Sequence, residues 1–79
     1  MNEEFIYKME LKIIKPLSKL EIGCGMRKWK ISIESGIPID FLTVFLKRMK
    51  ISGKVEIITT WDKFKDTPNG SAYCLTKNN

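Results

Sequence analysis

The sequence lacks several features on which common enzyme chemistries depend. It contains no histidine, so the usual general base for catalysis near neutral pH is missing. It has no glycine-rich phosphate loop, and its nine acidic residues are interpreted as scattered, solvated charges. The sequence therefore argues against an enzyme and predicts no cofactor.

Cysteines and long apolar runs are equally scarce. The two cysteines, Cys24 and Cys74, lack the short spacing of a metal knuckle, and no histidine completes one, so no metal site is expected. The apolar runs are a few residues long, far short of the roughly 20 that span a bilayer. No basic leader with an apolar core precedes the rest. A cytoplasmic location is therefore the default expectation.

The composition is that of a small globular domain. The chain has 79 residues, of which 43% are hydrophobic and 29% are charged, so residues 1–79 are expected to form a single domain. A domain of this size buries only about 60–65% of the surface of its unfolded chain. Its core is therefore thin, and association of two copies would add stability.

The net charge of +5 is unevenly distributed along the sequence. Residues 1–26 contain four acidic and four basic side chains, which cancel. Residues 27–79 contain ten basic and five acidic side chains, and the difference accounts for the whole net charge. A local basic excess is typical of proteins that bind polyanions, although a merely soluble basic surface gives the same numbers.

Hydrophobic spacing predicts two helices in the first half of the chain. Phe5, Ile6, Met9 and Ile13 fall on one stripe of a helix over about residues 2–15, which Pro16 is expected to end or bend. Residues 24–26 are interpreted as a loop or very short strand. A short helix follows at about 28–35, although its apolar residues also alternate as in a strand.

The second half predicts a longer helix and a hairpin. The helix covers about residues 38–51, with an apolar stripe formed by Leu42, Phe45, Leu46 and Met49. The hairpin covers about residues 54–76. Its first strand is rich in β-branched residues, a turn is expected at 66–70 because of Asn69-Gly70, and the returning strand follows at 71–76.

The order and spacing of these features resemble the winged helix-turn-helix domain of bacterial and archaeal transcriptional regulators. The resemblance covers about residues 26–76, and no single element of it is diagnostic. It is carried by Ile31-Ser32, Gly36-Ile37-Pro38, Leu42, Leu46, Met49, Gly53-Lys54-Val55-Glu56 and the strand at 73–76. It implies an α+β fold with three helices and a C-terminal β-hairpin wing.

The resemblance also implies a function, namely sequence-specific binding of double-stranded DNA by a homodimeric transcriptional regulator. The third helix would enter the major groove, where Thr43 could reach a base edge, Val44 a thymine methyl group and Asp40 a cytosine amino group. Asp40 serves equally well as a charge at a helix N-terminus. The candidates on this helix are Ile39, Asp40, Thr43, Val44, Lys47, Arg48 and Lys50. The candidates for backbone and wing contacts are Arg27, Lys28, Lys30, Lys63, Lys65 and Asn69.

Other uses of the same domain stay open at this point. Ile39, Phe41 and Val44 make the third helix more apolar than a typical reading helix, which favours a protein-interaction module. Binding to RNA is a third interpretation. The fold implied by the resemblance would also bring Cys24 near Cys74, so an intramolecular disulfide, an intermolecular disulfide and two free thiols are all open.

Overall fold

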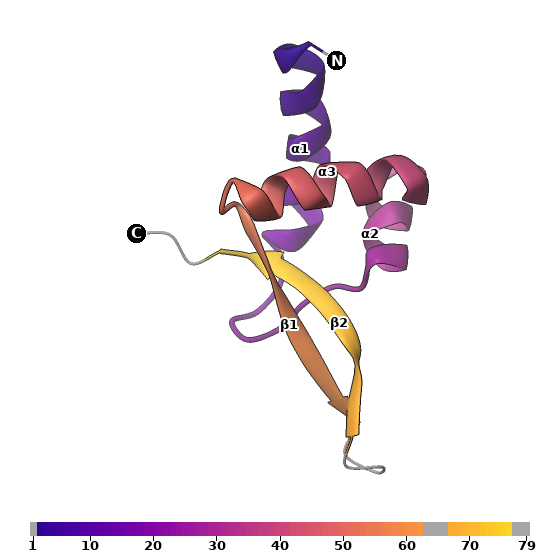
Figure 1. Cartoon of the computed structure of the whole chain (residues 1–79), viewed down its shortest axis with the longest axis vertical. Coiled ribbons are helices and arrows are strands. Elements are labelled where there is room, and N and C mark those ends of the chain that lie inside the picture. Colours follow the sequence, from indigo (N-terminus) through magenta and orange to yellow (C-terminus); the bar gives the residue numbers. More distant parts are fainter. Residues whose placement is uncertain (1, 63–66, 77–79) are drawn as a thin grey trace.

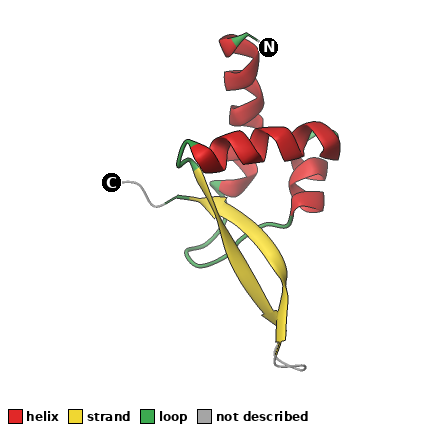
Figure 2. Ribbon diagram, viewed as in Figure 1, coloured by secondary structure: helices red, strands yellow, loops and turns green. Residues whose placement is uncertain are grey.

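The chain folds into a helical body from which a long hairpin projects (Figures 1 and 2). The computed structural model describes residues 2–62 and 67–76, and within the strands only the backbone of residues 60–62 and 67–69. In this range the elements are α1 (Glu3–Leu17), α2 (Lys28–Ser35), α3 (Ile39–Ile51), β1 (Val55–Asp62) and β2 (Thr67–Leu75). The strands pair antiparallel. This confirms the predicted α+β winged helix-turn-helix arrangement.

Helix α1 continues through the proline that was expected to end or bend it. Asn2 caps its start by accepting a hydrogen bond from the Phe5 amide at 2.7 Å, and the helix ends at Leu17, one residue beyond Pro16. A proline this close to a helix end removes a single backbone hydrogen bond. Pro16 and Leu17 are both buried, so packing of the last turn offsets that loss.

The connection between α2 and α3 is a tight turn held by two serines. Gly36 ends α2 in the left-handed conformation, with φ of 74°, which a glycine adopts without strain. The Ser32 hydroxyl donates to the Ile37 carbonyl at 2.6 Å, and the Ser35 hydroxyl accepts from the Ile37 amide at 3.3 Å. Pro38 is the N-cap, so α3 begins one residue later than predicted.

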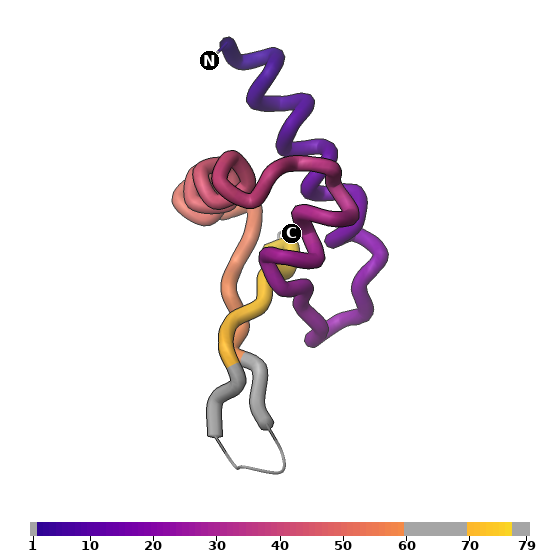
Figure 3. The backbone as a smooth tube through the Cα atoms, turned by 90° about the vertical axis from the view of Figure 1, so that its right-hand side faces the viewer, coloured from indigo at the N-terminus to yellow at the C-terminus, as the bar shows by residue number. Residues whose placement is uncertain are grey.

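The core lies where the three helices meet the base of the hairpin. The two views of the backbone show α3 crossing α1, with the first half of α1 extending beyond the rest of the body (Figures 1 and 3). The largest fully buried side chains come from all three helices and are Ile13, Ile31, Leu42, Phe45, Leu46 and Met49. Among the helices of the described residues, none combines the length and apolar character required to cross a bilayer.

The hairpin differs from its prediction at the Asn69-Gly70 pair. Both residues lie within β2 and not in the turn, because β2 already begins at Thr67. Thr59 pairs with Ser71 whereas Trp61 pairs with Pro68, so two residues of β2 face one residue of β1. This is a β-bulge, and Gly70 adopts φ of 88° within it. The positive φ expected of this dipeptide is therefore used to bend the strand.

A short backbone bridge holds the segment before α2 against the hairpin. Met26 and Tyr73 exchange two backbone hydrogen bonds, each 2.8 Å long. Of the two interpretations of residues 24–26, a loop or a very short strand, this bridge corresponds to the very short strand. The approach depends on Gly25, since a Cβ atom there would lie 2.8 Å from Cβ of Ala72. The base of the hairpin is thus attached to the helical body in two ways. The chain connects β1 to the end of α3, and the bridge connects β2 to the segment before α2.

Candidate nucleic-acid interface

The outward face of α3 is exposed along its length. The buried residues Leu42, Phe45, Leu46 and Met49 occupy one side of the helix. Helical spacing places a mixed polar and apolar set on the other side, and all of its members are exposed: Asp40, Thr43, Val44 and Lys47. These four residues form what we call the α3 outer face. No other described element covers it, so a ligand has direct access.

Two residues of the α3 outer face have defined polar chemistry. The Thr43 hydroxyl donates to the Ile39 carbonyl at 2.8 Å, so its oxygen is left to accept hydrogen bonds. In that state Thr43 suits the amino groups of adenine or cytosine. Asp40 lies in the first turn of α3, where its charge is favourable to the helix dipole. Both roles predicted for Asp40 are consistent with this position.

The three basic residues near the end of α3, Lys47, Arg48 and Lys50, differ in their surroundings. Lys47 and Lys50 are exposed and form no ion pair with other described residues. Arg48 instead borders a hollow that is also lined by Glu3 and Glu10 of α1. The structure therefore brings Lys47 together with the α3 outer face and places Arg48 on the flank that faces α1. Ile39 is 45% exposed at the start of the helix.

Of the three basic residues at the start of α2, Arg27 lies against the hairpin. Arg27 and Lys28 are half-buried, whereas Lys30 is exposed. The Arg27 guanidinium lies so close to Gly70 that a Cβ atom on this glycine would be 2.6 Å from Nη1. Arg27 thus packs against the bulged part of β2, and a phosphate contact would be an additional role. Trp29, which the sequence did not single out as a site residue, is 56% exposed between Lys28 and Lys30.

The wing candidates are described only in part. Lys63 and Lys65 lie outside the described residues. Asn69, expected near the wing tip, belongs to β2, and its side chain also lies outside the described part. The described parts of β1 and β2 project away from the helical body (Figure 1).

Comparisons with protein-family models, curated proteins and solved structures found no match. Among the described residues, no group of three or more cysteine, histidine or acidic side chains is arranged to hold a metal ion.

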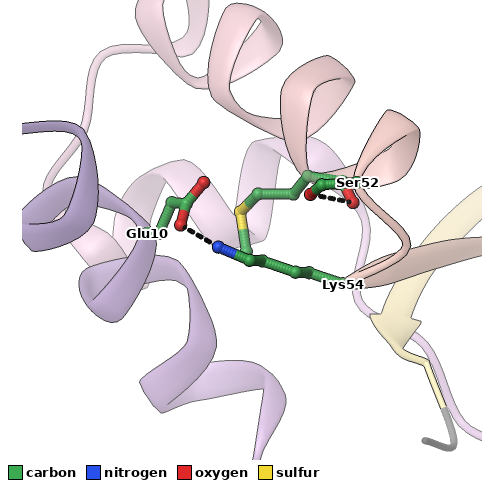
Figure 4. A network of polar contacts seen from close by, with 4 residues as sticks. Glu10, Ser52 and Lys54 are labelled. Carbon is green, nitrogen blue, oxygen red and sulfur yellow. Dashed lines mark hydrogen bonds and ion pairs between the residues drawn. The ribbon is translucent and has the colours of Figure 1, made fainter. Parts of the chain in front are cut away.

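A partly buried ion pair between α1 and the residue before β1 was missed by the sequence analysis (Figure 4). Lys54 Nζ lies 2.6 Å from Glu10 Oε1, and the Glu10 side chain is only 9% exposed, so the interpretation of all acids as solvated charges is wrong. The signal was present, because Glu10 falls on the helical stripe of Ile6, Ile13 and Leu17. The partner could not be found, since it lies 44 residues away. The pair fixes α1 to the start of the hairpin.

The two cysteines border the same hollow between α1 and the hairpin. Both are free thiols in the structure, Cys24 exposed and Cys74 half-buried. The Cys74 thiol lies 3.6 Å from Glu56 Oε1. The disulfide stays a prediction, and counting reactive thiols on the purified chain together with non-reducing electrophoresis distinguishes the three alternatives.

Proposed function

We propose that this chain is a homodimeric regulator that binds double-stranded DNA in a sequence-specific manner, with α3 in the major groove and the hairpin on the flanking backbone. The supporting observation is the uncovered α3 outer face, which includes Lys47, with the exposed Lys50 beside it and a projecting hairpin directly after α3. A helix fits the width of the major groove, and such a helix followed by a wing is the arrangement used by DNA-binding domains of this kind.

The charges are consistent with this orientation. Two of the described lysines are engaged within the chain, Lys8 with Glu4 and Lys54 with Glu10. Lys47 and Lys50 lack such partners in the described part of the chain, so their ammonium groups are available to phosphates. Contacts of this kind position a protein on a duplex, while Thr43 and Val44 would supply contacts to base edges.

The first test is a titration of random-sequence duplex DNA at two salt concentrations. Replacing Lys47 and Lys50 together with alanine is expected to weaken binding about 10- to 100-fold and to reduce the salt slope by about 2, because two phosphate contacts are lost. The Lys63→Ala/Lys65→Ala variant tests the wing in the same way. Fluorescence anisotropy with a labelled duplex measures both quantities.

The matched control is the Lys8→Ala/Lys19→Ala variant. It removes the same charge from exposed positions on and just after α1, and its affinity should stay within about twofold of the wild type, since distant exposed charges are largely screened. Binding that ignores salt, or that falls equally in the α3 and control variants, would contradict the proposal.

A second candidate function is a protein-interaction module that uses the apolar part of α3. Ile39, Phe41 and Val44 are 45%, 61% and 48% exposed, which is unusual for side chains on one short helix. Val44→Glu separates the two candidates. If α3 lies in the groove, the added negative charge should weaken duplex binding at least about tenfold. The control is Ile33→Glu, a change of the same chemistry at an exposed position of α2. Unchanged duplex affinity in Val44→Glu would favour the interaction module.

A further inference from the structure

An apolar groove runs between the first half of α1 and the connection from α2 to α3. Its volume is about 410 Å³, and six apolar residues line it: Phe5, Met9, Ile37, Pro38, Phe41 and Phe45. Lys12 provides the polar part of its border. The members of the α3 outer face are not among the lining residues, so the groove and the candidate DNA surface are separate.

The groove leaves large apolar side chains in contact with water. Phe41 is 61% exposed and Phe5 is 43% exposed, although the Phe5 ring packs against Phe45 with centroids 6.2 Å apart. Tyr7 and Leu11 on α1 are 59% and 43% exposed but do not line the groove, so the apolar surface considered is that of Phe5 and Phe41 with the residues between them. Figures 1 and 3 both show this half of α1 extending past the other elements. Contiguous exposed apolar surface of this kind is characteristic of an interaction site.

The charges of α1 indicate which partner fits. The helix begins with the exposed acids Glu3 and Glu4, and its second half carries the exposed bases Lys12 and Lys15. A second α1 laid antiparallel along the groove brings the acidic turn of one copy beside the basic turn of the other. A twofold axis produces this contact twice, which is the self-complementarity that an isologous dimer requires. A parallel arrangement would instead oppose acid with acid.

The available ionic partners support this assignment. Glu3, Lys12 and Lys15 form no ion pair with other described residues. Glu4 contacts Lys8 at 3.5 Å, but both side chains are more than half exposed, so this pair can exchange partners at little cost. Lys12 therefore gives the apolar groove a basic border, and Lys15 lies one turn further along α1. The first turn of α1 presents the acid Glu4 beside the apolar Phe5, which is the matching set.

We infer that a second copy of this chain covers the groove, with the two α1 helices antiparallel about a twofold axis. This inference rests on the homodimer in the proposed function and names its interface. It does not depend on DNA binding. The interface leaves the α3 outer face of each copy uncovered, because those four residues do not line the groove.

The apolar part of the interface is tested by Phe41→Glu. The variant should raise the dimer dissociation constant at least about 100-fold, because a charged carboxylate would replace a large apolar side chain in the apolar part of the interface. Sedimentation velocity without DNA measures the association state, and circular dichroism verifies that the helices are retained. Ile33→Glu is the matched control, since Ile33 is 70% exposed and does not line the groove, and it should remain dimeric.

The charged part of the proposed interface is tested by reversing the charges at either end of α1. Glu3→Lys/Glu4→Lys and Lys12→Glu/Lys15→Glu should each weaken self-association, whereas an equimolar mixture should restore dimers, because each variant then complements the other. A wild-type chain that stays monomeric at high micromolar concentration would overturn the inference and leave the groove to another partner. Dimers that persist in Phe41→Glu, or swapped variants that fail to pair with each other, would also overturn it. Since no DNA is present, each of these outcomes is distinguishable from failure of DNA binding.

Discussion

Replacing Phe45 with alanine is expected to lower the free energy of unfolding by about 3–5 kcal/mol, the range for a buried phenylalanine in a packed core. The Phe45 side chain is 1% exposed and lies where α3 crosses α1, with the Phe5 ring packed against it. Small domains have about 5–15 kcal/mol of stability in total, so this loss takes the variant close to unfolding. Urea denaturation followed by circular dichroism gives the value.

The control for this prediction lies on the same helix. Ile51 is 78% exposed, and Ile51→Ala should change the free energy of unfolding by no more than about 0.5 kcal/mol. Both variants are compared at one protein concentration, because the proposed dimer would make the apparent stability depend on concentration. Similar losses in the two variants would show that Phe45 does not lie in the core as described.

The two members of the partly buried ion pair, Glu10 and Lys54, are expected to respond unequally to substitution. Lys54→Met leaves the Glu10 carboxylate without its partner at a site where only 9% of the side chain is exposed, so a loss of about 2–4 kcal/mol is expected. Glu10→Leu leaves a lysine that is 48% exposed and can turn to water, so the change should stay within about 1 kcal/mol.

The double variant completes this test. In Glu10→Leu/Lys54→Met no buried charge is left unpaired, and most of the stability lost in Lys54→Met should return. Urea denaturation of all four proteins gives the coupling energy between the two sites. Equal losses in the two single variants would contradict the asymmetry in burial from which the prediction is derived.

The ion pair also bears on the candidate interface. Lys54 directly precedes β1, and its carbonyl accepts a hydrogen bond from the Thr76 amide at 3.1 Å. Glu10 therefore helps to fix the base of the hairpin relative to α1. Arg27 against Gly70 and the bridge between Met26 and Tyr73 attach the hairpin to the start of α2. These contacts set where a projecting wing lies relative to α3.

The sequence by itself determined the elements and most of their ends. The helix over 28–35 was predicted with the observed bounds, because Gly36 supplies a left-handed stop. The apolar stripe predicted for α3 consists of the same four residues that are buried in the structure, since helical spacing alone decides which side chains share a face. These features depend on neighbours within four or five residues, so the local sequence contains the information.

The tertiary structure decided the relations between residues that are far apart in sequence. It paired Glu10 with Lys54, placed Asn69-Gly70 in a bulged strand instead of a turn, and continued α1 beyond Pro16. It also left Phe41 exposed beside an apolar groove, although Phe45 on the same helix is buried. At Pro16 and at Asn69-Gly70 local propensity favours the other outcome, and it carries no information about pairs that are far apart in sequence. Packing of the whole chain decides these features.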